Sequence, residues 1–271
     1  MSRNFELMQQ TGKAWDIGPV VVKDPKPFIP FPSTERVPER EDGRHGERAK
    51  VVPLPSPGLR PMDQVARDES FRLVQRLFLH STTVPPRVVV FAGIDHGNGC
   101  SRICVEAAQA LSTHAPGAVC IVEANFRTPS LPDLFGTTNH CGLTNALLGN
   151  DPIRSFTKPV HKEGLWLLSA GALDARSHGL LNSDRLRLRF DELRGEFDYL
   201  LVDAPPLTRY SDALALGRVS DGLVIVLEAH STRRDVALGI TENIRAAQVP
   251  ILGVVLNKRT FPIPEALYRA F

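Results

Sequence analysis

The run RVVVFAGIDHGNGCSRICVEAAQALS, residues 87–112, decides the fold of this chain. It opens with β-branched and aromatic residues from Val88 to Phe91, which favour a strand. Glycines follow at positions 93, 97 and 99, and an apolar stretch with good helix formers begins at Cys100. A strand, a glycine-rich turn and a helix together frame a phosphate-binding loop, because backbone N–H groups and the helix dipole attract anions at a helix N-terminus.

The loop departs from the working pattern at one decisive position. A P-loop carries a lysine after its last glycine and then Ser or Thr for Mg²⁺. Here Cys100 stands where the lysine belongs, while Ser101 keeps the hydroxyl. Ile94 replaces the first glycine of the strict pattern, and Arg102 replaces the third glycine of a dinucleotide G-x-G-x-x-G motif. The nucleotide site predicted from this loop therefore has weakened phosphate binding, and it consists of Gly97, Asn98, Gly99, Cys100, Ser101 and Arg102.

Composition sets bounds on the class of protein. The chain has 271 residues, enough for one ordinary core, and its 32 basic and 30 acidic residues give no electrostatic footprint for nucleic acid. No apolar run is long enough for a transmembrane helix, and residues 1–10 lack the apolar region of a secretion signal. The four cysteines lack paired CxxC spacing, so we expect reduced, mostly buried thiols in a cytoplasmic protein without a zinc site. They are Cys100, Cys104, Cys120 and Cys141.

The pattern along the chain predicts three parts. Residues 1–62 hold 10 of the 22 prolines and a charged run, and are typical of a largely disordered arm. Residues 63–260 alternate between strands and helices, and residues 261–271 form a short tail. We expect strands at 87–93, 118–123, 165–170, 199–203, 222–227 and 251–257, and helices at 63–80, 100–113, 142–148, 183–194, 211–216 and 231–247.

These strands are continuous apolar runs, which is typical of a parallel sheet buried on both faces. Right-handed crossovers then predict a doubly wound α/β fold with a mostly parallel sheet. Ligands bind outside the carboxyl ends of the strands in such sheets. Polar residues stand at three of those ends, namely Glu123, Asp203 and Asn257.

Asp203 is the strongest candidate among them. An acidic residue that closes an apolar strand in a P-loop protein orients Mg²⁺, and Ser101 would bind the same metal. The alternatives are a helix cap for Asp203 and a first-turn serine for Ser101. Glu123 is a second candidate, as a metal ligand or as the acceptor of a substrate proton. It is one methylene longer than Asp, and its neighbours Asn125 and Arg127 complete a polar group after that strand.

Seven segments between about residues 69 and 257 resemble the bacterial tyrosine kinase (BY-kinase) family, the cytoplasmic P-loop kinases of capsule and exopolysaccharide synthesis. They are ESFRLVQRLFL, AGIDHGNGCSR, IVEANFRTPSLPDLFG, GLTNALLGN, LLSAGALDARSHGLLNSDRL, FDYLLVDAPPLTRYSDALAL and ILGVVLNK. The resemblance implies a P-loop NTPase fold with a deviant Walker A motif, of MinD/ParA-like architecture.

The resemblance also implies ligands and partners. ATP or ADP with Mg²⁺ would be bound, and the residue at Asn257 would contact the adenine. The partners implied are a membrane polysaccharide co-polymerase (chain-length regulator) or homologous kinase subunits, which would hold the protein at the inner face of the membrane. The family's ring-forming motif E-x2-R-x2-R is present as Glu69 and Arg72 but ends in Gln75, so a homo-oligomer is one expectation.

The departures from the family pattern fall on catalysis. Cys100 and Arg102 alter the loop, Glu123 and Asn125 replace both aspartates of the second acidic motif, and the tail has a single tyrosine, Tyr268. Losing one well-aimed donor costs roughly 100- to 1000-fold in rate. We therefore expect a regulatory or scaffolding pseudokinase.

Three alternatives stay open. The first is an active, ATP-dependent tyrosine autokinase in which Arg102 or Arg127 supplies the missing charge. The second is a ParA/MinD-like ATPase, which shares the fold. The third is a redox-sensing thiol at Cys100, since a helix N-terminus can lower a thiol pKa.

Overall fold

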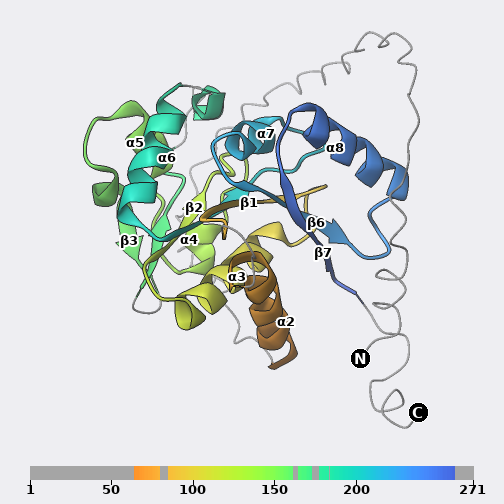
Figure 1. Ribbon diagram of the computed structural model, residues 1–271. Coiled ribbons are helices and arrows are strands. Elements are labelled where there is room, and N and C mark those ends of the chain that lie inside the picture. Colours follow the sequence, from red (N-terminus) through yellow and green to blue (C-terminus); the bar gives the residue numbers. More distant parts are fainter. Residues whose placement is uncertain (1–63, 80–84, 161–163, 173–176, 183, 260–271) are drawn as a thin grey trace, which may run out of the picture. The chain divides into compact units, whose positions relative to one another are not determined.

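The computed structural model describes residues 64–79, 85–160, 164–172, 177–182 and 184–259 (Figure 1). The predicted arm at residues 1–62 and the tail at 261–271 lie outside the described residues. The structure describes most of the region between them, for which alternating strands and helices were predicted.

The described residues form one seven-stranded sheet with the order β3-β4-β2-β5-β1-β6-β7. All neighbouring strands are parallel except β3 and β4, so the predicted mostly parallel, doubly wound α/β fold is confirmed. The strands are β1 (Val88–Gly93), β2 (Val119–Glu123), β3 (Thr157–Pro159), β4 (Leu165–Leu168), β5 (Tyr199–Ala204), β6 (Gly222–Glu228) and β7 (Ile251–Asn257).

The sheet is apolar on both faces because alternate residues of each central strand enter different cores. Val88 and Val90 of β1 belong to one buried cluster, whereas Val89 and Phe91 belong to the other. Every residue of β1 and β2 is buried. This double burial explains why the strands are continuous apolar runs in the sequence.

The helices divide between the two faces (Figure 1). One face is covered by α2 (Gln64–Val74), which continues as the π-helical turn η1 (Gln75–Leu79), by α3 (Cys100–His114) and by the short α4 (Leu131–Leu134). The other face is covered by α5 (Leu143–Leu148), α6 (Asp184–Glu196), α7 (Asp212–Gly217) and α8 (Arg234–Ala246). Two 3₁₀ turns, η2 (Ile153–Phe156) and η3 (Ser177–Asn182), complete the list.

The structure corrects the prediction in several short elements. The helix predicted at 63–80 changes to a π-helical turn after Val74, and the strand predicted at 165–170 ends at Leu168. The elements α4, η2, β3 and η3 were not predicted. Three of them have four residues or fewer, too few for a periodic pattern, and β3 ends at a proline. The fourth, η3, is a 3₁₀ turn, whose period differs from that of an α-helix.

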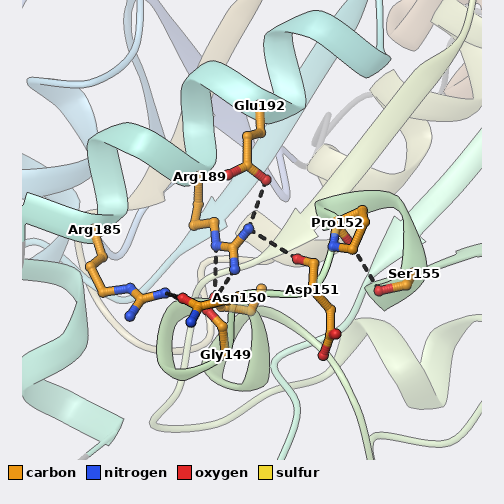
Figure 2. A network of polar contacts seen from close by, with 9 residues as sticks. Gly149, Asn150, Asp151, Pro152, Ser155, Arg185, Arg189 and Glu192 are labelled. Carbon is orange, nitrogen blue, oxygen red and sulfur yellow. Dashed lines mark hydrogen bonds and ion pairs between the residues drawn. The ribbon is translucent and has the colours of Figure 1, made fainter.

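A buried arginine fixes the end of α5 against α6 (Figure 2). The Arg189 side chain is 5% exposed. Its guanidinium donates hydrogen bonds of 2.6–3.1 Å to the backbone oxygens of Ala146, Gly149 and Asp151 and to the carboxylate of Glu192. Arg185 adds a hydrogen bond of 2.7 Å to Asn150. The last carbonyls of a helix have no partner within it, so Arg189 caps α5 at Ala146, and the two arginines together hold the segment that follows the helix.

Candidate functional site

The loop between β1 and α3 has the conformation that its glycines permit. Gly97 and Gly99 have φ angles of 84° and 81°, in the left-handed region that favours glycine. A Cβ atom on Gly99 would also collide with the side-chain amide of Asn257. The chain then enters α3 at Cys100, so the free N–H groups at the start of that helix point into the loop.

Contacts within the loop and with the ends of β6 and β7 hold this loop in place. Asn98 is 3% exposed, and its Oδ1 accepts a hydrogen bond from the backbone N–H of Asp95. Asn257, at the end of β7, donates from Nδ2 to the backbone oxygen of Asn98 at 2.8 Å. Glu228 lies 3.5 Å from the Asn98 amide and pairs with Lys258 at 3.1 Å. Asn257 thus positions the loop, and its adenine contact stays a prediction.

The segment after β5 also contacts the loop, which sequence reasoning missed. The backbone N–H groups of Leu207 and Thr208 donate to the backbone oxygens of Gly93 and Ile94. The Thr208 hydroxyl is 3.0 Å from the Asp95 carboxylate, and the Arg209 guanidinium is 3.8 Å from the same group. The loop is therefore joined to both neighbouring strand ends, and Arg209 is a cation beside it.

Ser101 and Asp203 meet as the sequence predicted. The Ser101 hydroxyl donates to Asp203 Oδ2 at 2.5 Å, and Asp203 is fully buried. Burial raises the pKa of Asp203 to about 6, while hydrogen bonds from Ser101 and Cys100 lower it in part. The second oxygen, Oδ1, is buried and has no hydrogen-bond partner. A hydroxyl beside a carboxylate with an unused oxygen fits the oxygen ligands that Mg²⁺ takes, so these two residues would hold that ion.

Cys100 occupies the lysine position with a neutral side chain. Burial, and next the negative charge of Asp203, raise the pKa of the thiol well above its usual value. The lowered thiol pKa considered for a redox sensor is therefore wrong. A protonated thiol supplies no positive charge to a phosphate.

Glu123 is committed to the backbone that follows its strand. Its Oε2 accepts hydrogen bonds of 2.8 Å from the N–H groups of Ser130 and Leu131, at the start of α4, and its Oε1 accepts one of 3.2 Å from Asn125. Glu123 is fully buried, and burial together with the charge of Asp203 raises its pKa. This geometry favours a structural cap, while the catalytic role stays a prediction.

The two arginines considered as substitutes for the lysine are paired with carboxylates. Arg102 donates to Glu106 at 2.8 Å, one turn farther along α3. Arg127 lies 3.7 Å from Asp212 and stacks over the ring of Tyr210, with 4.3 Å between the guanidinium carbon and the ring centroid.

Two further properties concern residues 64–259 apart from the gaps given above. All four cysteines are free thiols, and no three His, Cys, Asp or Glu side chains are grouped as metal ligands. Over the same residues, no helix has both the length and the apolar character that a membrane span requires.

A protein-family model matches much of the chain. The ParA family model described as "NUBPL iron-transfer P-loop NTPase" matches residues 85–269.

Individual proteins similar to the chain include several tyrosine kinases. The chain is 27% identical over 139 residues to the tyrosine-protein kinase YwqD of Bacillus subtilis, covering 51% of this chain and 59% of that one. It is 24% identical over 173 residues to the tyrosine-protein kinase CpsD of Streptococcus agalactiae, covering 64% and 75%. Identity to the tyrosine-protein kinase etk of Escherichia coli is 29% over 140 residues, 51% of this chain and 19% of that protein.

Solved structures share the fold. The chimerical protein CapA2B2 matches with a TM-score of 0.67 and 22% identity, covering 72% of this chain and 85% of that one. The VpsO kinase domain matches with a TM-score of 0.66 and 24% identity, covering 72% and 95%. MinD of Pyrococcus horikoshii, solved with Mg-ADP, matches with a TM-score of 0.54 and 19% identity, covering 68% and 77%.

Proposed function

We propose that this chain, which belongs to the ParA family of P-loop NTPases, is a regulatory or scaffolding pseudokinase of capsule or exopolysaccharide synthesis. The similarity to tyrosine kinases supports the kinase-like part of the proposal.

The observation that carries the proposal is the presence of Cys100 at the start of α3, where a working P-loop has its lysine. The negative charge of Asp203 helps to raise the pKa of this thiol, so the side chain carries no charge that could bind a phosphate. Phosphoryl transfer depends on positioning and on charge stabilisation of the transferred group. The arginines that could compensate, Arg102 and Arg127, are engaged with Glu106 and Asp212. The chain thus keeps the frame of the site without its principal cation.

The two residues that would hold Mg²⁺ support weak nucleotide binding. Ser101 and Asp203 lie together, and Asp203 offers an unused oxygen. Mg²⁺ bound there would neutralise phosphate charge, and the N-terminus of α3 would add backbone donors. We therefore propose that ATP or ADP binds with Mg²⁺, with an affinity reduced by the missing lysine.

The proposed partners follow from the resemblance to the BY-kinase family. They are a membrane polysaccharide co-polymerase or homologous kinase subunits, through which the protein would lie at the inner face of the membrane. The motif for ring formation is altered at Gln75, and in this chain Glu69 pairs with Arg72 of the same helix at 2.7 Å. Docking on a partner accordingly has more support than a homomeric ring.

One observation favours a second function, an active autokinase with a displaced cation. Arg209 lies 3.8 Å from Asp95 of the loop, and its side chain is 60% exposed, so it is within reach of a bound phosphate. Exchange of its ion pair with Asp95 for one with a phosphate would supply the charge that Cys100 lacks.

Transfer of label from radioactive ATP with Mg²⁺ tests both candidates. We expect the native chain and its Arg209→Ala variant to show the same background labelling, with a tyrosine kinase such as the E. coli etk kinase domain as positive control. Labelling of the native chain at a kinase-like rate, abolished by Tyr268→Phe and by Arg209→Ala, would replace the pseudokinase by the active kinase.

A further inference from the structure

The last strand of the sheet, β7, has an unpaired edge within the described part of the chain. It pairs with β6 on one side and is the end of the strand order. Two of its large apolar side chains, Val254 and Leu256, are 58% and 54% exposed. An exposed apolar edge strand is a template for another strand, and proteins normally cover such edges.

The hydrogen bonds of β7 show which residues face this edge. The N–H of Ala229 donates to the backbone oxygen of Asn257 at 2.9 Å, so Asn257 directs its carbonyl toward β6. Backbone groups alternate in direction along a strand. Val255 therefore also faces β6, whereas Val254 and Leu256 direct their N–H and C=O groups to the open edge.

We propose that residues 261–265 of the same chain, FPIPE, fold back on this edge as an antiparallel strand. The described chain ends at Arg259, two residues after β7, and Lys258 has a φ angle of 55°, in the left-handed region that occurs in turns. A four-residue connection over residues 257–260, a common length for a hairpin, places Phe261 opposite Leu256 and Ile263 opposite Val254. Each exposed apolar side chain thus gains an apolar partner on the same face of the sheet.

The prolines exclude every register that is shifted by an odd number of residues, and the length of the connection selects among the others. In an antiparallel pair only alternate residues turn their backbone groups to the neighbour, and proline has no N–H to donate. With Phe261 and Ile263 bonded to the open edge, Pro262 and Pro264 fall at the positions whose nitrogen atoms point outward. A shift by one residue would place both prolines where a donor is required. Prolines on the outer side also prevent a further strand from adding.

The rest of the tail would reach a hollow at the other end of β7. The regular part of β7 begins at Gly253, because Leu252 is an extra residue between those that pair with Leu223 and Val224 of β6. Glu265 would lie beside this irregular start of the strand. There α8, the turn that follows it and β7 line an open hollow of about 600 Å³, whose walls include Arg245, Pro250, Ile251 and Val254. Leu267 and Phe271 are the large apolar residues that follow Glu265 in the sequence.

This docking has a consequence for Tyr268, the one tyrosine of the tail. The candidate site lies at the carboxyl ends of the strands, whereas the docked tail carries Tyr268 to the amino end of β7. The tyrosine is then kept away from the loop of its own chain. This consequence, unlike the docking itself, rests on the proposed kinase-like function.

Amide hydrogen exchange on the full chain tests the docking. We expect the N–H groups of Val254 and Leu256 to exchange on the order of tenfold or more slowly in the native chain than in a Phe261→Asp, Ile263→Asp double variant. A Pro262→Ala, Pro264→Ala variant is the matched control and keeps the protection, because those nitrogen atoms point away from β7. Equal exchange in the native chain and the Asp variant overturns the proposal, whatever the kinase assay shows.

A cross-link identifies the occupant of the edge. Opposite residues of a hydrogen-bonded antiparallel pair have Cα atoms about 5.5 Å apart, within the range of a disulfide. Oxidation of a Val254→Cys, Ile263→Cys variant with diamide should link the two residues within one chain, as mapped by peptide mass spectrometry, and a Val254→Cys, Pro264→Cys variant should link far less. Links between isotopically light and heavy chains would assign the edge to a second copy and contradict the proposal.

Discussion

Glu123 and Asp203 are Cα partners on the adjacent parallel strands β2 and β5, yet their carboxylates serve different groups. Both oxygens of Glu123 accept hydrogen bonds from the backbone between Asn125 and Leu131. Asp203 accepts from Ser101 with one oxygen and keeps the other unused. The longer side chain at position 123 thus stabilises a loop, and Asp203 is the carboxylate that stays available to a metal ion.

Replacement of Glu123 by Ala removes the acceptor for three backbone N–H groups, two of them at the start of α4. We expect the free energy of unfolding to fall by about 2–4 kcal/mol, because buried donors without acceptors are costly. Urea denaturation measures the change. Glu123→Gln keeps one acceptor oxygen and should cost much less. An Ala variant as stable as the native chain would show that the cap contributes nothing.

Asp203 makes stability depend on pH. Its pKa in the folded chain is raised from 3.8 to about 6, so the folded state favours the protonated form, and this contribution to stability is lost as pH rises from about 4 to 6. Asp203→Asn removes the buried charge and should raise the free energy of unfolding at pH 7 by up to about 3 kcal/mol, with no gain at pH 4. Thermal unfolding without Mg²⁺ at the two pH values checks this, and an equal gain at both would contradict it.

The pKa of Asp203 also affects metal binding. A protonated carboxyl is a poor ligand for Mg²⁺, so any Mg²⁺-dependent nucleotide affinity should fall as pH is lowered through 6. Titrations at pH 7.5 and 5.5 measure the ratio. An affinity that does not change would mean that Asp203 does not hold the metal.

Arg189 provides a prediction outside the site. Arg189→Met leaves the backbone oxygens of Ala146 and Asp151 without this donor, whereas Gly149 keeps its hydrogen bond from Arg185, and we expect a loss of about 2–4 kcal/mol in the free energy of unfolding. Arg185→Met is the matched control. It removes a less buried guanidinium, and Gly149 keeps its hydrogen bond from Arg189, so the loss should be under about 1 kcal/mol. Equal losses in the two variants would contradict this assignment.

Much of the fold could be predicted because its signals are local. The apolar run from Val88 to Phe91, followed by Gly97 and Gly99, gave the strand, loop and helix. The proximity of Ser101 to Asp203 followed from the rule that the carboxyl ends of parallel strands meet at one edge of the sheet.

What could not be predicted depends on tertiary contacts. The cap that Glu123 makes for α4 depends on how the loop after β2 folds back, and a four-residue helix has no periodic signal. Arg209 reaches Asp95 only because the segment after β5 lies along the loop after β1. The raised pKa of Cys100 results from its burial beside Asp203, whereas its place at a helix N-terminus indicates the opposite direction.

The most direct test of the central claim, that the site lost its phosphate clamp at Cys100, is the calorimetric titration of Mg²⁺·ATP into the native chain and into Cys100→Lys. We expect the variant to bind at least about tenfold more tightly than the native chain, with Cys100→Ala as a control that leaves the native affinity unchanged. Micromolar, Mg²⁺-dependent binding by the native chain that Cys100→Lys does not improve would contradict it.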